Sequence, residues 1–137
     1  EIPTATRSHW LKQTDLFSGC GSDSLEVISS FMEERSFRAG ELICEKGADS
    51  SEVFLLVDGE AFVHASGNTQ VGQITLEPGA CFGEMAILAD QPRSATVVAG
   101  TNGAQTLVLE GAVFREALIK QPTIGMELLK TFSKRLA

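Results

Sequence analysis

The chain has 137 residues, of which 43% are hydrophobic and 21% charged, and its formal net charge is −7. This composition is typical of a single globular domain and excludes disordered and collagen-like chains. No apolar run reaches the roughly 20 residues of a membrane-spanning helix, and the scattered basic residues predict that this chain alone binds no nucleic acid. Cys20, Cys44 and Cys81 form no C-x-x-C pair, which predicts reduced thiols, no metal site and a cytoplasmic location.

The N-terminal segment, residues 1–34, is predicted to be helical. Residues 8–17 have the pattern of a short helical or turn-rich segment. Asp23 and Glu26 then have the spacing of a capping box, and the apolar residues that follow recur at helical spacing. We therefore expect a helix over about residues 24–33.

Residues 35–110 contain short strand-like runs separated by turn residues. The Asp58-Gly59 pair lies between two apolar runs and predicts a two-residue hairpin, since both turn positions require positive φ. Regularly spaced short strands with such turns predict a sandwich or a barrel. The clearest strand-like runs are residues 42–44, 53–57, 61–63, 71–76, 95–99 and 106–109.

Beyond residue 110 the apolar pattern changes to helical spacing. Val113, Phe114, Ala117 and Leu118 fit one predicted helix, and Pro122 suits the first turn of another. In that last helix every fourth residue is apolar, which produces a stripe made of Ile124, Leu128, Phe132 and Leu136. The stripe packs either on the domain itself or on a partner protein, and the sequence leaves both alternatives open.

Residues 82–97, with the sequence FGEMAILADQPRSATV, combine groups that can hold a sugar and a phosphate. Gly83 permits close backbone approach, and Glu84 follows with a carboxylate that accepts hydrogen bonds from hydroxyl groups. The next residues can form one helical turn, whose first N–H groups point toward an anion. The planar guanidinium of Arg93 matches two phosphate oxygens, and Ser94 adds a hydroxyl beside it.

This segment, within an order of helices, strands and helices, resembles the cyclic nucleotide-binding domain of catabolite activators, protein kinase regulatory subunits and cyclic-nucleotide-gated channels. The phosphate-binding cassette of that family has the form F-G-E-(L/M)-A-(L/I)-x-x-x-x-P-R-(S/A/T)-A-T-V, and residues 82–97 fit it throughout. Residues 37–59 also look like the early strands of the family. The resemblance covers nearly the whole chain and implies a single domain over residues 1–137.

The resemblance implies an α+β, mainly β fold. Its centre would be an antiparallel, jelly-roll-like barrel over residues 35–110 that contains a short cassette helix. N-terminal helices would precede the barrel, and two C-terminal helices over residues 111–137 would follow it. The chain would then be a regulatory sensor without catalytic residues, metal or cofactor. Ligand capture would draw in the cassette and let the two C-terminal helices swing against the barrel, and an effector domain or partner protein would contact the C-terminal helix.

The resemblance also implies roles for individual residues. Glu84 would hold the ribose 2′-hydroxyl, and Gly83 would support it through a backbone contact. Arg93 would bind the cyclic phosphate, with help from the backbone N–H of Ala86 and from Ser94.

The resemblance also bears on which nucleotide is bound. In the families that this chain resembles, serine after the cassette arginine, here Ser94, is common where cAMP is bound and threonine accompanies a preference for cGMP, so cAMP is the expected ligand and cGMP is the alternative. The base is expected to pack on apolar residues of the strand before the cassette, with Ile74 and Met85 as the candidates.

Four other interpretations compete with a cyclic nucleotide sensor. Glu84 and Arg93 could form only a surface ion pair, which would not account for the adjacent glycine. A metal-binding barrel enzyme needs clustered ligands, whereas the chain has only His9 and His64. A haem or iron–sulfur sensor needs a cysteine set that is absent here. The sensor half of a catabolite-activator-type transcription factor would need a DNA-binding module after residue 137.

Overall fold

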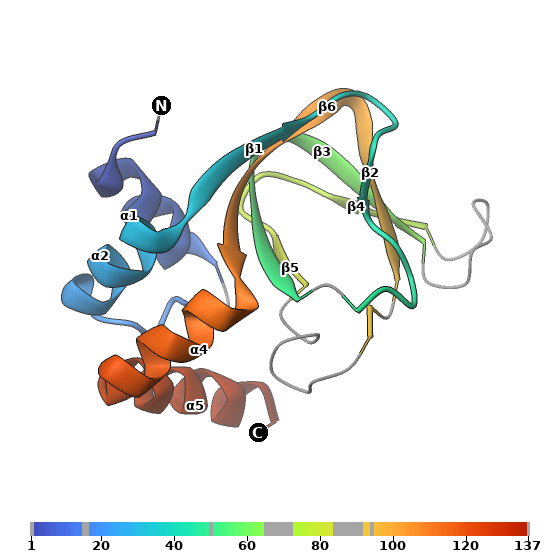
Figure 1. The fold of residues 1–137 in the computed structure, drawn as a ribbon. Helices are drawn as coiled ribbons and strands as arrows, with labels where there is room; N and C mark the ends of the chain where they lie inside the picture. The colour runs from blue at the N-terminus through green and yellow to red at the C-terminus, as the bar shows by residue number, and fades with distance from the viewer. Residues whose placement is uncertain are drawn as a thin grey trace.

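Four helices and six strands make up the part of the chain that the structure describes (Figure 1). This computed structural model describes residues 2–14, 17–49, 51–64, 73–83, 92–93 and 95–136. The helices are α1 (Thr4–Gln13), α2 (Ser22–Phe31), α4 (Gly111–Lys120) and α5 (Pro122–Leu136). The strands are β1 (Glu33–Phe37), β2 (Leu42–Cys44), β3 (Glu52–His64), β4 (Gln73–Leu76), β5 (Cys81–Phe82) and β6 (Thr96–Glu110).

The strands form one antiparallel sheet that is organised around its two longest members. Strands β3 and β6 pair along most of their length, β1 and β2 pair with β6, and β4 and β5 pair with β3. The helices gather at one end of this sheet (Figure 1). Helices combined with an antiparallel sheet confirm the predicted α+β class, while the predicted cassette helix lies outside the described residues. None of the described helices is long and apolar enough to cross a membrane.

Strand β3 runs straight through the Asp58-Gly59 pair, so the predicted two-residue hairpin was wrong. Gly59 does have a positive φ of 82°, but the register with β6 shifts on both sides of the pair, which marks an irregularity within the strand. A Cβ on Gly59 would lie 2.2 Å from the carbonyl oxygen of Gly103. Close approach of two strands therefore requires this glycine. Strand β6 is likewise continuous and joins the predicted strands at 95–99 and 106–109.

Helix α2 is capped from α5, so the predicted capping box was also wrong. The helix begins at Ser22, and Asp23 is exposed in its first turn. The carboxylate of Glu127 accepts hydrogen bonds from the backbone N–H of Gly21 and, at 2.8 Å, from Ser24 Oγ. The Glu127 carboxylate thus provides the hydrogen-bond acceptor at the start of α2. The sequence had predicted that a side chain of α2 itself would do so. Glu127 lies 106 positions later in the chain than Gly21.

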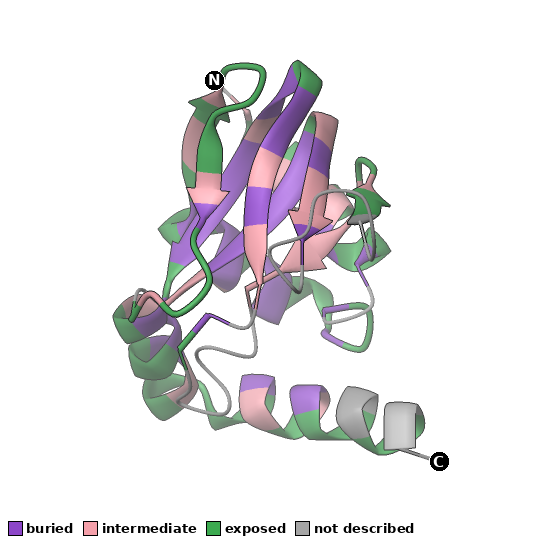
Figure 2. Ribbon diagram, turned by 90° about the vertical axis from the view of Figure 1, so that its right-hand side faces the viewer, coloured by how far each residue is buried: buried purple, intermediate pink, exposed green. Residues whose placement is uncertain are grey.

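The C-terminal helices begin where the sequence predicted, and the first half of the α5 stripe packs on the domain. Ile124 is 0% and Leu128 is 3% exposed, and both belong to the hydrophobic cluster that joins the helices to β3 and β6. The buried positions of α5 lie on the side of the helix that faces the sheet (Figure 2). The side chains of Phe132 and Leu136 lie outside the described part of the structure.

A second hydrophobic cluster lies between the strands, away from the helices. It contains Phe54 and Leu56 of β3 together with Val97 and Val108 of β6. Phe37 and Phe82 are partly buried and pack against it. The cluster therefore holds the first and last residues of the cassette, Phe82 and Val97.

Candidate functional site

Arg93 lies just before β6, and the surrounding backbone fixes its position. Its backbone N–H donates to the carbonyl oxygen of Ala48 at 2.9 Å, and its own carbonyl oxygen accepts the N–H of Gly47 at 2.8 Å. These two hydrogen bonds tie the arginine to the turn after β2. The residue is only 5% exposed, and a buried cation is costly unless polar or charged groups compensate it.

The guanidinium of Arg93 reaches Gly83, which follows β5 directly. Arg93 Nη1 donates a hydrogen bond to the carbonyl oxygen of Gly83 at 3.1 Å. Gly83 has a φ of 91°, and a Cβ on it would lie 2.6 Å from Arg93 Nη1 and 2.5 Å from the carbonyl oxygen of Glu52. Only glycine leaves room for the arginine at this point.

An aromatic ring, itself stacked on a second one, lies beside the same guanidinium. The Cζ atom of Arg93 is 5.6 Å from the ring centroid of Phe54, which is within the range of a cation–π contact. The Phe54 ring stacks on Phe82, with 5.1 Å between centroids and 12° between planes. Phe82, which directly precedes Gly83, therefore helps to hold the ring of Phe54 that faces Arg93.

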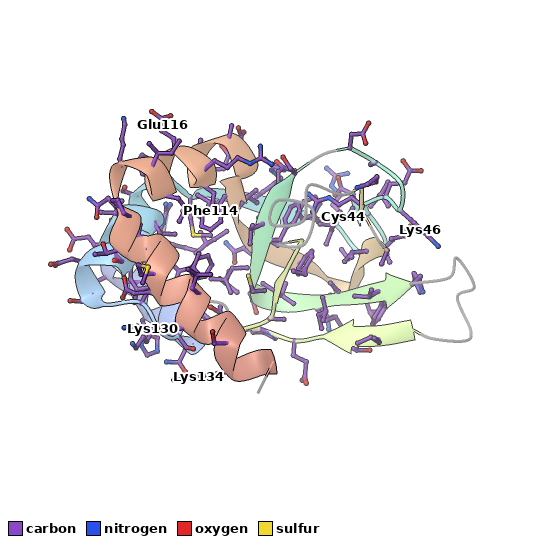
Figure 3. All side chains as sticks on the ribbon, turned by 90° about the horizontal axis from the view of Figure 1, so that it is seen from below. Cys44, Lys46, Phe114, Glu116, Lys130 and Lys134 are labelled. Carbon is purple, nitrogen blue, oxygen red and sulfur yellow. The ribbon has the colours of Figure 1, made fainter. Side chains whose placement is uncertain are left out.

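Cys44, at the end of β2, is a titratable neighbour whose properties bear on this charge. Burial raises the pKa of its thiol from 9.0 to about 11, while the positive charge of Arg93 acts in the opposite direction. The thiol is therefore neutral at physiological pH, and no thiolate at this position compensates the charge of Arg93. Figure 3 shows Cys44 at the end of the sheet away from α4 and α5, with Lys46 close by in the chain.

The structure brings two of the predicted site residues together. Gly83 and Arg93, which lie 10 positions apart within the cassette, meet through the hydrogen bond between Nη1 and the carbonyl oxygen. Ile74, a predicted base contact, lies on β4 and is 57% exposed. The remaining predicted residues lie outside the described part of the chain: Glu84, Met85, Ala86 and Ser94.

Phe54 was not predicted as part of the site. It belongs to the apolar run 53–57, and such a run predicts a buried strand without saying which side chain faces a ligand site. The turn containing Gly47 and Ala48 was likewise predicted only as part of the early strands. Its two hydrogen bonds to Arg93 depend on the packing of β2 against β6.

The described residues contain no group of three or more histidine, cysteine, aspartate or glutamate side chains that could hold a metal ion. What they do present is a buried guanidinium with a hydrogen bond to a backbone carbonyl and an aromatic face beside it. Such a group binds anions, and its planar donors favour carboxylates and phosphates.

A family model described as "Cyclic nucleotide-binding domain" matches residues 34–121. A cyclic nucleotide-gated potassium channel of Mesorhizobium japonicum is 34% identical over 120 residues, which are 88% of this chain and 32% of the channel. The cAMP-dependent protein kinase regulatory subunit of Dictyostelium discoideum is 27% identical over 130 residues, which are 93% of this chain and 39% of that protein. The chain thus spans between 32% and 39% of the length of these two relatives.

Solved structures have the same fold. The regulatory domain of Toxoplasma gondii PKA, solved with cAMP, superimposes with a TM-score of 0.76 at 20% identity, over 96% of this chain and 50% of that one. The N-terminal domain of a transcriptional regulator from Streptomyces coelicolor A3(2) superimposes with a TM-score of 0.82 at 20% identity. That match covers 93% of this chain and 91% of the regulator domain.

Proposed function

Because this chain belongs to the cyclic nucleotide-binding domain family, whose members are regulatory sensor domains, we propose that it binds cAMP at the site around Arg93 and Gly83. The observation that carries the proposal is the buried Arg93 guanidinium held against Gly83, two positions of the cassette in direct contact. A cyclic phosphate is a monoanion with two exposed oxygens, which the planar edge of a guanidinium can bind at once. The anion would compensate the buried positive charge, whose field is strong where water is excluded.

The rest of the cassette completes the proposed site. Glu84 would accept a hydrogen bond from the ribose 2′-hydroxyl, beside the backbone of Gly83. The backbone N–H of Ala86 and the hydroxyl of Ser94 would donate to the phosphate. The support for these roles is the unbroken cassette sequence, because each residue type matches the polar group assigned to it.

The preference for cAMP rests on one cassette residue and on one relative. Ser94 favours cAMP, and a relative named as a cAMP-dependent kinase subunit matches 93% of this chain. A relative named human cGMP-dependent protein kinase 2 is 30% identical over 80% of this chain, so cGMP is the second candidate. Ile74, with its exposed side chain on β4, and Met85 are the proposed contacts of the base.

We also propose that α4 and α5 transmit the binding event. In this proposal residues 1–137 form one jelly-roll-like domain of a cytoplasmic protein, and α5 is the segment that reaches an effector or partner. Met126 and Leu129 support this role, since they are 58% and 59% exposed and lie away from the buried residues Ile124 and Leu128. A ligand can shift α5 only by binding one of its arrangements more tightly than another.

The direct test is calorimetric titration of the purified chain with cAMP and with cGMP under the same conditions. We expect saturable one-to-one binding that is tighter for cAMP. Tighter binding of cGMP would reverse the assigned preference and keep the site, whereas no heat with either nucleotide would overturn the proposal.

A second candidate is the sensor half of a transcription factor, favoured by the high coverage of the Streptomyces regulator domain. The test is to sequence the full open reading frame that encodes this chain. A helix-turn-helix module downstream of residue 137 would support it, and a channel or kinase module would exclude it.

A further inference from the structure

Phe54 contacts both parts of the proposed anion site. Its ring centroid is 5.6 Å from Arg93 Cζ. A Cβ placed on Gly83 would lie 3.5 Å from Phe54 Cδ1, so the ring also borders the glycine that accepts the hydrogen bond from Arg93. Phe54 is 1% exposed and lies on β3, the strand that pairs with β4, β5 and β6.

Two further aromatic rings fix the orientation of Phe54. Phe82 stacks on it at 5.1 Å and 12°, and Phe37 packs edge-on at 6.5 Å and 63°. Rings in a packed cluster of this kind occupy one rotamer, because any other would collide with a neighbour. The plane that Phe54 presents to the guanidinium is therefore set by the core and not by the arginine.

The chemistry of the contact suits a residue that must bind an anion. The face of an aromatic ring carries negative electrostatic potential and attracts a guanidinium, and this attraction uses none of the N–H donors. An acidic side chain in the same place would hold Arg93 more strongly, but its charge would compete with a phosphate. An aliphatic side chain would fill the space without attracting the cation.

We propose that Phe54 is a positioning residue for Arg93, whose ring orients the guanidinium for the cyclic phosphate through a cation–π contact. This inference rests on the proposed function of the site. It assigns to Phe54 a role besides hydrophobic packing, so the two roles must be separated by the experiment.

Fluorinated phenylalanines separate the cation–π role of Phe54 from its role in hydrophobic packing. Fluorine weakens the negative potential of the ring face while nearly preserving the shape of the ring. Mono-, di- and trifluorophenylalanine would be introduced by codon suppression at position 54 and, as the matched control, at Phe37. Phe37 belongs to the same aromatic cluster and contacts Phe54 by its edge. Affinity for cAMP and cGMP would be measured by calorimetry, and thermal unfolding would be measured without nucleotide.

At position 54 we expect nucleotide affinity to decrease with each added fluorine and to be about tenfold lower with three fluorines. At position 37 we expect affinity to change less than about twofold. The unfolding temperature should shift equally little in both series. Equal losses of affinity in the two series, or unchanged affinity at position 54, would overturn the positioning role while leaving the proposed function intact.

A second measurement reads the contact without any nucleotide. In the NMR spectrum of the wild-type chain, the Nε–H proton of Arg93 should carry a ring-current shift from Phe54 that Phe54→Leu removes. If the wild-type chain binds neither nucleotide, the proposed function fails, and this resonance still decides whether the ring of Phe54 lies against Arg93. An identical chemical shift in the two proteins would overturn the inference.

Discussion

Arg93 donates a hydrogen bond from Nη1 to the carbonyl oxygen of Gly83 at 3.1 Å, and this contact joins two positions of the cassette that lie 10 residues apart. The geometry leaves no room for a side chain at position 83 and gives the buried guanidinium a fixed acceptor. The contact thus connects the local sequence motif to the tertiary structure.

Replacement of Arg93 by lysine should weaken cyclic nucleotide binding by about 2 kcal/mol or more. An ammonium group cannot donate two parallel hydrogen bonds to a phosphate, and one bond to a charged group is lost. Isothermal calorimetry measures the change. Arg38→Lys is the matched control, because Arg38 is exposed on the turn after β1; equal affinities for the Arg93 variant and this control would refute the phosphate role.

Replacement of Glu84 by glutamine should weaken the binding of cAMP more than that of 2′-deoxy-cAMP. The proposed partner of the carboxylate is the 2′-hydroxyl, which the deoxy analogue lacks, so only the natural ligand loses a charge-assisted hydrogen bond. Competition of each nucleotide against a fluorescent analogue gives its dissociation constant for the wild-type chain and for the variant. The ratio of these two constants is then compared between cAMP and 2′-deoxy-cAMP. Identical losses for the two ligands would exclude the ribose assignment.

Replacement of Gly83 by alanine should lower both stability and affinity. The substitution forces a residue with a Cβ into a positive φ of 91° and against Arg93 Nη1 and the Glu52 carbonyl oxygen. Gly79→Ala is the matched control, because Gly79 has a φ of 102° but no heavy atom within 4 Å of the position that a Cβ would occupy. In urea denaturation the free energy of unfolding should fall by at least about 1 kcal/mol more for Gly83→Ala than for Gly79→Ala. Only the Gly83 variant should bind nucleotide more weakly.

Replacement of Glu127 by alanine should destabilise the fold by about 1–2 kcal/mol, because the N-terminus of α2 loses its carboxylate acceptor. Glu116→Ala on α4 is the control. Its carboxylate pairs with Lys120 at the surface, and its removal should cost no more than about 0.5 kcal/mol. A Glu127 variant as stable as the Glu116 variant would contradict the capping role.

The stability of the fold should decrease as the pH rises from about 9 to about 11. Burial is the largest cause that raises the pKa of the Cys20 and Cys44 thiols from 9.0 to about 11, with the charge of Glu127 adding to the effect at Cys20. Between these values the folded chain keeps protons that the unfolded chain releases, so the free energy of unfolding falls with rising pH. Urea denaturation at pH 8, 9 and 10 would measure the decrease, and Cys20→Ala/Cys44→Ala should reduce its slope.

Several elements follow from sequence patterns that are local. The run 42–44 forms β2 as predicted, and Pro122 begins α5 as predicted. They rest on a short apolar run, on helical period and on a residue with restricted φ, which act over a few positions. By contrast, β1 has the sequence EERSF, and its position in the sheet comes from pairing with β6.

The two corrected predictions show where local patterns stop being informative. Asp58-Gly59 has turn chemistry, yet the pairing of β3 with β6 on both sides of it keeps the strand extended. Asp23 has the spacing of a cap, yet Glu127 occupies that role from α5. In both cases a distant segment satisfies the backbone groups that the local motif would otherwise satisfy.

The family, the cassette and its candidate binding residues could be recognised from residue types and spacing, because those residues lie within one short stretch of chain. The burial of Arg93, its hydrogen bond to Gly83 and its contact with Phe54 became visible only in the folded chain. Burial and cation–π geometry depend on which strands pack together. That packing is a property of the whole hydrophobic core, which no single segment of the sequence encodes.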